Sequence, residues 1–321
     1  MPKVSIIVPV YNVEKYLEKC LDSLVNQTLQ DIEIIVVNDS TPDDSQIIID
    51  HYVKQYPHLI KSYIKPNGGI ADTRNFGISK VTGEYFGFVD SDDYVELTMF
   101  EKMYEEAIKK DADLVSCNFY WEYPDKLVQA TDGPFKDNHE YMTEMIATLW
   151  TKIYKTSWFN SLDIKFPTGL RYEDSSLLIR LAPHIRRFGF VGEPFVYYVQ
   201  RTGSITHTHN HRVRDMLEVF SGIYDYFKQH DLIESYHEEL EYLFIKYFLG
   251  SSFLRAAQIK DKTERKYVLS NGWKLLNETF PNWKKNHYLN KKKDKKHLYF
   301  RMMNSFSYWG FAKVFSVIKR G

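Results

Sequence analysis

The stretch VSIIVPVYN (residues 4–12) is a run of apolar, mostly β-branched residues that ends in Tyr11 and Asn12. It is too short and too β-branched for a helix, so it predicts a buried strand. The next segment, 14–28, places its apolar side chains on one helical face, and 32–39 is a second apolar strand. This order predicts a βαβ unit, in which a helix joins two parallel strands.

The same alternation continues for about a hundred residues. We expect a helix over 43–56, a strand over 60–65, a turn at 67–69, a helix over 71–80, a strand over 84–90, a helix over 97–110 and a strand over 113–120. The fold class is therefore α/β, with a mostly parallel central sheet flanked by helices. In such sheets, ligands bind at the carboxyl ends of the strands.

The chain has 321 residues, which is more than a single core usually comprises. The pattern is less regular after residue 125 and becomes helical from 212, so we place the main boundary near 211. The expected domains are 1–211 and a helical region, 212–321, that binds an acceptor, dimerises to a homo-oligomer, or does both. Formal net charge is zero and no recognition module appears, so we expect no nucleic-acid partner.

Cys20 and Cys117 form no metal-binding or disulfide pattern, and each lies in an apolar segment, so we expect buried free thiols in a reducing compartment. The N-terminus has no signal-peptide pattern, and no uncharged apolar run approaches the length of a membrane span. These features predict a cytoplasmic protein.

Three carboxylates end the strand in YFGFVDSDDY (85–94), namely Asp90, Asp92 and Asp93. Charges so close repel one another unless a cation lies among them. Asp90 and Asp92 can share a divalent metal, and hard oxygen ligands suit Mg²⁺ or Mn²⁺. The alternative is that Ser91 or Asp92 caps a helix.

Two other segments carry polar residues after predicted strands. Asp39 can accept a hydrogen bond from a base or a ribose hydroxyl, or it can be an ordinary turn residue. PNGGIADTRN (66–75) offers Gly68 and Gly69 for close backbone approach and Arg74 for phosphate charge, or it is a turn with a solvated arginine.

Four motifs in this order resemble the family 2 glycosyltransferases of the GT-A fold, of the bacterial surface-polysaccharide type. They are VSIIVPVYN, IEIIVVNDSTPDDS, PNGGIADTRN and GEYFGFVDSDDY, and the likeness resumes at YEDSSL (172–177) and RTGSITH (201–207). The resemblance implies an inverting transfer of a sugar from a nucleotide-sugar donor, most often UDP-linked. Residues 1–120 would then bind the donor, and 121–211 would form the acceptor half.

The resemblance also implies roles for individual residues. Pro9, Val10, Tyr11, Asn12 and Asp39 would hold the base, Asn67, Gly68 and Arg74 would lie along the nucleotide and its phosphates, and Asp90 with Ser91 would face the ribose or the metal. Asp92 would be the main metal ligand and His207 a further one. Asp174, next to Glu173, would be the catalytic base, although a helix dipole also favours acids at this position.

Three departures from the family pattern concern the donor pocket. Asn38 stands where an acid is usual, Ser40 and Pro42 lie in a turn that usually has a glycine, and Asp72 replaces a small residue. Asp72 beside a diphosphate is unfavourable unless it points away or pairs with a lysine.

The histidines at 207, 209 and 211 alternate, which also suits a zinc site, but no fourth ligand is evident nearby. The tail is basic and then aromatic: KKNHYLNKKKDKK (284–296) precedes a helical pattern over 298–320. On a helical wheel, Arg301, Ser305, Tyr308, Ala312, Ser316 and Lys319 form one stripe beside a wide apolar sector. This pattern favours the inner surface of an anionic membrane, reached through 284–320, or packing against protein.

The sequence therefore predicts a metal-dependent glycosyltransferase, peripheral to the cell membrane, that extends a lipid-linked surface glycan. Two alternatives stay open. A nucleotidyltransferase shares the sheet and the carboxylates but usually has a glycine-rich basic loop after the first strand, which PVYNVEKYL lacks. A non-catalytic nucleotide-sugar-binding scaffold would bind the donor without turnover.

Overall fold

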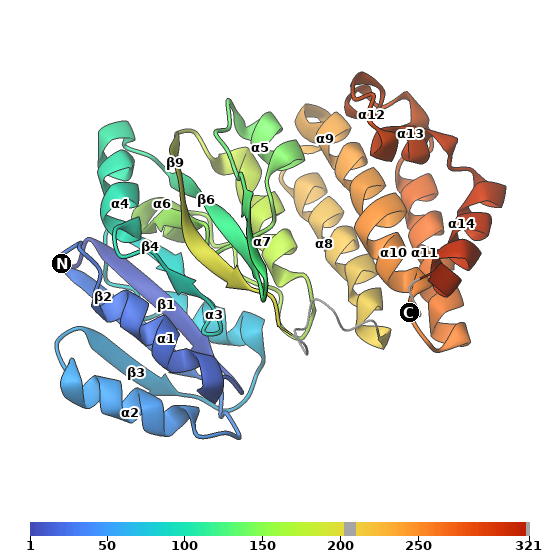
Figure 1. Ribbon diagram of the computed structural model, residues 1–321. Helices are drawn as coiled ribbons and strands as arrows, with labels where there is room; N and C mark the ends of the chain where they lie inside the picture. The colour runs from blue at the N-terminus through green and yellow to red at the C-terminus, as the bar shows by residue number, and fades with distance from the viewer. Residues whose placement is uncertain (202–209, 319–321) are drawn as a thin grey trace. The chain divides into compact units, whose positions relative to one another are not determined.

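The computed structural model describes residues 1–201 and 210–318. The chain forms two compact units, one of Met1–Gly169 with Glu173–Thr202 and one of Leu170–Tyr172 with Gly203–Gly321 (Figure 1).

The first unit is built on one sheet of nine strands (Figure 1). The strands are β1 (Val4–Val10), β2 (Ile32–Asn38), β3 (Ile60–Ile64), β4 (Tyr85–Phe88), β5 (Tyr94–Val95), β6 (Leu114–Tyr123), β7 (Lys126–Ala130), β8 (Lys152–Lys155) and β9 (Phe188–Val199). Their order is β3-β2-β1-β4-β8-β6-β9-β5, and β7 pairs with β6. β1 is parallel to β2 and β4, β2 to β3, and β6 to β9, whereas β5, β7 and β8 run antiparallel to their neighbours. The predicted α/β class is confirmed.

Helices cover the sheet because its central strands are apolar on both faces: every residue of β1 is buried. The helices of the unit are α1 (Glu14–Val25), α2 (Ser45–Gln55), α3 (Ile70–Ile78), α4 (Met99–Lys110), α5 (Asn138–Glu144), α6 (Thr156–Ser161), α7 (Glu173–Leu181) and the short η1 (Ala182–His184). In α1 the predicted face, with Leu17 and Leu21, is buried. Cys20 and Cys117 are buried and free, as predicted.

Past residue 120 the structure contains elements that the sequence pattern did not predict. β7, β8, α5 and α6 are all short. β8 even carries a fully buried charge, since the Lys152 ammonium pairs with the buried Asp132 carboxylate. Lys152 also donates to the Thr148 carbonyl at 2.8 Å and to Thr151 Oγ1 at 3.0 Å. A pattern of hydrophobic residues cannot predict a strand whose lysine side chain is buried.

The second unit is helical (Figure 1). Its described elements are η3 (His211–Arg214), α8 (Asp215–Gln229), α9 (Ile233–Ile245), η4 (Lys246–Ser251), α10 (Ser252–Ala257), α11 (Lys262–Thr279), η5 (Trp283–Lys285), α12 (His287–Lys291), α13 (Lys295–Met302) and α14 (Ser305–Ile318). Aromatic rings fill its core, with Phe220 packed edge-on against Phe244 and Phe248.

The tail is two helices rather than the single helix expected over 298–320, because the chain breaks at Met303 and Asn304. Tyr308 and Ala312, from the stripe on the helical wheel, are buried. The Tyr308 hydroxyl donates to the Leu269 carbonyl, which fixes this face of α14 inward. No helix within 1–201 or 210–318 is long and apolar enough to span a membrane.

Candidate active site

The strand order places β1 between β2 and β4, so the connections leave β1 in opposite directions. This reversal opens a crevice at the carboxyl ends of the strands in α/β sheets. Asn12, Asp39 and Asp90 follow β1, β2 and β4 at this edge. Tyr11 and Asn12 are exposed there, while Pro9 and Val10 lie buried within β1.

The acidic turn after β4 is not a helix cap. It leads into β5, and α4 begins only at Met99, after Thr98. The helix-cap alternative for Ser91 and Asp92 is therefore wrong. Ser91 is buried within the turn.

Asp93 is buried and anchors this turn, since its Oδ1 accepts a hydrogen bond from the Val199 N–H at 2.9 Å. Its Oδ2 is buried with no hydrogen-bond partner among the described residues. Burial, then the charges of Asp92 and Asp90, raise the pKa of Asp93 well above its usual range.

Arg201 supplies a positive charge that the sequence analysis missed. Its Nε and Nη2 both donate to Asp92 Oδ2, at 2.9 and 2.6 Å, and its guanidinium lies 4.9 Å from the ring centre of Tyr16. Burial and the charge of Asp90 raise the pKa of Asp92, and Arg201 opposes this shift. Arg201 opens the RTGSITH motif, so its place in the motif was the available signal.

Arg74 joins two carboxyls from distant segments. Its Nη1 donates to Glu173 Oε1 at 2.7 Å and its Nη2 to Asp90 Oδ1 at 2.8 Å, while its Nε is buried without a partner among the described residues. Burial alone would lower the pKa of Arg74, but Asp90 and Glu173 outweigh it and raise the pKa. Both terminal nitrogens are thus engaged by protein, and a phosphate contact for Arg74 stays a prediction.

Glu173 and Asp174 open helix α7. Burial and the neighbouring Asp174 charge raise the pKa of Glu173, although Arg74 opposes this. Burial likewise raises the pKa of Asp174, again against Arg74. Asp174 Oδ1 accepts the Ser175 N–H at 2.6 Å. The sequence predicted acids at a helix start, and the structure adds the pairing of Glu173 with Arg74.

Three non-glycine residues beside these groups adopt a left-handed backbone. Asn12, Ser40 and Tyr172 have φ of 56°, 53° and 68°. Asparagine tolerates this region, but for a bulky residue such as Tyr172 it is strained. Ser40 occupies the turn in which the resembled family usually has glycine. Its positive φ explains why glycine is usual there, because glycine adopts this region without steric cost.

Asp39 holds the 66–69 loop. Its Oδ1 and Oδ2 accept the N–H groups of Gly68 and Gly69 at 2.9 and 2.8 Å, and Asn67 Nδ2 donates to its carbonyl at 3.0 Å. Lys65, which is also buried, lies 2.7 Å from Asp39 Oδ1. The Lys65 ammonium lies 2.5 Å from the Asp72 carboxylate. The negative charge of Asp72, which replaces the small residue usual in the family pattern, is therefore paired with a lysine.

The residues of the acidic turn fit a divalent cation. The guanidinium groups of Arg74 and Arg201 form ion pairs with three carboxyls, namely those of Asp90, Asp92 and Glu173. The carboxyls of Asp93 and Asp174 lie next to these in the chain. The buried Asp93 Oδ2 has no hydrogen-bond partner among the described residues. Burial first, and then the neighbouring carboxyl charges, raise the pKa of Asp92 and of Asp93, and a bound cation would offset the repulsion between these charges. His207, the third expected ligand, lies outside the described residues.

Comparison with known proteins agrees with this geometry. Residues 5–167 match the model of glycosyl transferase family 2. The chain therefore belongs to this family, and the predicted enzyme class, a glycosyltransferase, is confirmed.

Two curated relatives and one solved structure illustrate the likeness. The chain is 36% identical to the uncharacterized glycosyltransferase EpsJ of Bacillus subtilis, over 64% of this chain and 63% of EpsJ. It is 32% identical to the glycosyltransferase GlyG of Streptococcus pneumoniae, over 68% of this chain and 78% of GlyG. The structure of TarS 1-349 from S. aureus, in complex with UDP-GlcNAc, has a TM-score of 0.71 at 22% identity, covering 93% of this chain and 89% of that one.

Proposed function

We propose that the protein is a metal-dependent inverting glycosyltransferase that moves a sugar from a UDP-sugar to a growing, lipid-linked cell-surface glycan. The observation that carries this proposal is the Arg74 bridge. It holds Asp90, at the end of β4, and Glu173, beside Asp174, in one cluster. This bridge supports the proposal that the metal ligands and the base of an inverting transfer belong to one site.

Asp174 is the proposed base. In an inverting transfer, the acceptor hydroxyl oxygen attacks the anomeric carbon, the bond to the nucleoside diphosphate breaks, and a carboxylate takes the hydroxyl proton. A base must be ionised, and the Arg74 guanidinium favours the ionised form of Asp174 against its burial. Glu173 is occupied by Arg74, which leaves Asp174 as the carboxylate free to accept the proton.

Asp90 and Asp92 are the proposed metal ligands, with His207 as a third. When bound there, Mn²⁺ or Mg²⁺ neutralises the charge of the departing diphosphate. Asp92 is now paired with Arg201, whose guanidinium would be released toward the diphosphate when Asp92 takes a different partner.

The proposed donor pocket is the exposed edge formed by Tyr11, Asn12, Asn67 and Gly68, with Asp39 behind it. TarS, which shares the fold, has been solved with UDP-GlcNAc and with UDP, which supports a UDP-sugar as donor.

The tail supports a membrane-peripheral location on the cytoplasmic side. Phe306 and Val317 are 88% and 67% exposed on α14, and the lysine-rich segment 291–296 precedes them. An exposed apolar face beside lysines suits an anionic lipid surface.

Calorimetric titration of a UDP-sugar panel tests the proposal, first with Mn²⁺ and then with a chelator. We expect one UDP-sugar to bind, binding to be lost with the chelator, and sugar transfer to follow when an acceptor glycan is added. Binding without turnover would favour the scaffold alternative, and release of pyrophosphate would favour the nucleotidyltransferase. If no UDP-sugar binds, the donor assignment is wrong.

A further inference from the structure

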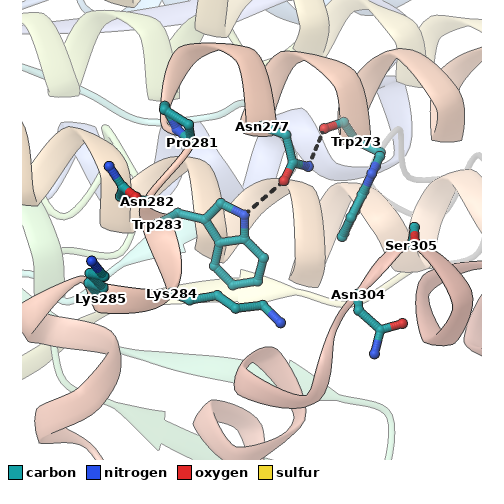
Figure 2. Close-up of a pocket in the computed structure, with 9 residues that line it drawn as sticks. All are labelled: Trp273, Asn277, Pro281, Asn282, Trp283, Lys284, Lys285, Asn304 and Ser305. Atoms are coloured by element: carbon teal, nitrogen blue, oxygen red, sulfur yellow. Dashed lines mark hydrogen bonds between the residues drawn. The ribbon is translucent and has the colours of Figure 1, made fainter.

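The second unit contains a cavity whose lining residues, all within 273–305, include none of the residues of the candidate active site and no carboxylate. It has a volume of about 310 Å³ and is lined by α11, η5 and the start of α14 (Figure 2). Its lining residues are Trp273, Asn277, Pro281, Asn282, Trp283, Lys284, Lys285, Asn304 and Ser305. This volume is at the lower end of the range of about 300–1,000 Å³ for small-molecule sites.

Asn277 bonds the Trp283 indole and the backbone carbonyl of Trp273 at this cavity. Its Oδ1 accepts the indole N–H of Trp283 at 3.1 Å, and its Nδ2 donates to the Trp273 carbonyl at 2.7 Å, as the dashed lines in Figure 2 show. Trp273 also packs against Tyr308, with ring centres 4.7 Å apart. Trp283 is buried and Trp273 is partly exposed, so part of the Trp273 ring surface is open to a ligand.

The polar groups of the cavity suit an anion. Lys284 and Lys285 are exposed, no acid is among the nine lining residues, and no described carboxylate lies within 4.0 Å of either ammonium. The Lys284 ammonium lies 5.5 Å from the Trp283 ring centre. A lysine that packs on an indole without a counter-ion is available for a phosphate or carboxylate.

Asn304 adds a hydrogen-bond donor. Its Oδ1 accepts the N–H groups of Phe306 and Ser307, both at 2.9 Å, which fixes the orientation of the amide. Asn304 lines the cavity, and its Nδ2 has no hydrogen-bond partner among the described residues. The cavity therefore combines aromatic surface, amide donors and unpaired ammonium groups.

We propose that this cavity binds a segment of an anionic glycan, with a sugar ring against Trp273 and a phosphate or carboxylate on Lys284 and Lys285. The apolar C–H face of a sugar ring packs on an indole, and its hydroxyls accept from amides such as Asn304 Nδ2. The ammonium groups of Lys284 and Lys285 would pair with the negative charge of such a glycan, and a neutral glycan cannot make this contact. This inference deepens the proposed function, because the acceptor class is a glycan, but it requires no donor for its test.

The test measures the binding of two anionic oligomers to the full chain, with tryptophan fluorescence as the readout and without donor or metal. One oligomer consists of hexuronic-acid-containing sugars and the other of sugar phosphates. A neutral oligosaccharide of equal length is the reference. We expect Lys284→Ala/Lys285→Ala to weaken binding about tenfold or more, since each ion pair to phosphate is a charge-assisted contact. The matched control, Lys260→Ala/Lys262→Ala, removes the same charge from exposed lysines outside the cavity and should change binding less than about twofold.

Trp273→Leu tests the stacking surface, with its melting temperature measured because Trp273 also packs on Tyr308. We expect weaker oligomer binding at an unchanged melting temperature, and Asn304→Ala reports on the amide if Trp273→Leu unfolds. If both double-lysine variants lose oligomer binding equally, the effect is one of diffuse charge and the proposal is overturned. Equal binding of the neutral oligosaccharide would also overturn it. Binding to phosphatidylglycerol vesicles but to neither oligomer would assign the cavity to lipid headgroups instead. Donor titration of the same variants should be unchanged, so a failure here is distinguishable from a failure of the donor site.

Discussion

Arg74 sets the charge balance of the candidate site, because one guanidinium group holds carboxyls from two distant segments. Arg74→Met should lower the free energy of unfolding by about 3–5 kcal/mol, since it leaves buried carboxyls without their partner. Arg74→Lys keeps the charge but cannot reach both partners, so we expect an intermediate loss. Urea unfolding measures both.

Lys136→Met is the matched control, because Lys136 pairs with Asp137 at the surface. We expect it to change stability by less than about 1 kcal/mol. Equal effects of the two methionine variants would show that the Arg74 bridge contributes no more than a surface pair.

Asp174→Asn separates chemistry from binding. We expect it to lower kcat for sugar transfer by about 10²–10⁴-fold, because the acceptor proton then has no base, while the calorimetric affinity for the donor stays unchanged. Asp92→Asn should instead weaken Mn²⁺-dependent donor binding.

Asp163→Asn, which changes an exposed acid, is the control for both variants. Wild-type turnover in Asp174→Asn would move the base to Glu173 or elsewhere.

The raised pKa of Glu173 gives stability a pH dependence. Because the folded state holds this proton more tightly than the unfolded state, the stabilisation is complete below the unfolded pKa of about 4.3 and is lost as pH rises through the folded pKa. Glu173→Gln cannot lose this proton. The unfolding free energy of the wild type minus that of Glu173→Gln should therefore fall as pH rises from about 4 to 8. A difference that is flat across this range would contradict the raised pKa.

Apart from the two-residue strand β5, the elements up to residue 120 were predictable, because each is long enough for its apolar period to show and strands alternate with helices. β1, α1, β2 and α4 begin and end within a few residues of the expected positions. Later elements depend on contacts that no local pattern contains, as with Lys152 in β8. In the tail, the helical wheel over 298–320 was drawn for one continuous helix. The chain instead breaks at Asn304, and Tyr308 in the second helix is buried, where its hydroxyl donates to the Leu269 carbonyl.

The candidate site was predictable to a similar degree. Motif order predicted Asp90, Asp92 and Asp174 as site residues, and the structure brings Asp90 close enough that burial and the charge of Asp90 both raise the pKa of the other two. The partners of each side chain, however, depend on the three-dimensional structure. Nothing in the sequence says that Arg74 would face Glu173, and the RTGSITH motif marks Arg201 without naming Asp92 as its partner.

The buried pair in β8 is a test at the scale of an element. Lys152→Met leaves Asp132 buried without its ammonium, and we expect a loss of about 3–5 kcal/mol in unfolding free energy. The double variant Lys152→Met/Asp132→Leu should recover part of that loss, because two apolar groups need no counter-charge. Thermal and urea unfolding of the single and double variants measure this, and a double variant less stable than Lys152→Met would contradict the argument.

For the molecule as a whole, the α14 face predicts membrane attachment. Phe306→Ser/Val317→Ser should weaken sedimentation with phosphatidylglycerol vesicles about tenfold or more, because burying one apolar side chain contributes about 1.5–3 kcal/mol. Ile47→Ser/Ile64→Ser is the control, since both side chains are more than 60% exposed in the first unit. Equal loss in both variants, or no binding by the wild type, would remove the membrane assignment.

The pairing of Lys65 with Asp39 and Asp72 constrains the order in which this pocket can change through mutation. If Asp72 is replaced first, Lys65 keeps its buried partner Asp39 and the chain still folds with a neutral pair. If Lys65 is replaced first, Asp39 is left buried without its ammonium and Asp72 adds a second negative charge beside it. A change at position 72 should therefore be tolerated better than a change at position 65, because only the second leaves a buried carboxylate without its ammonium.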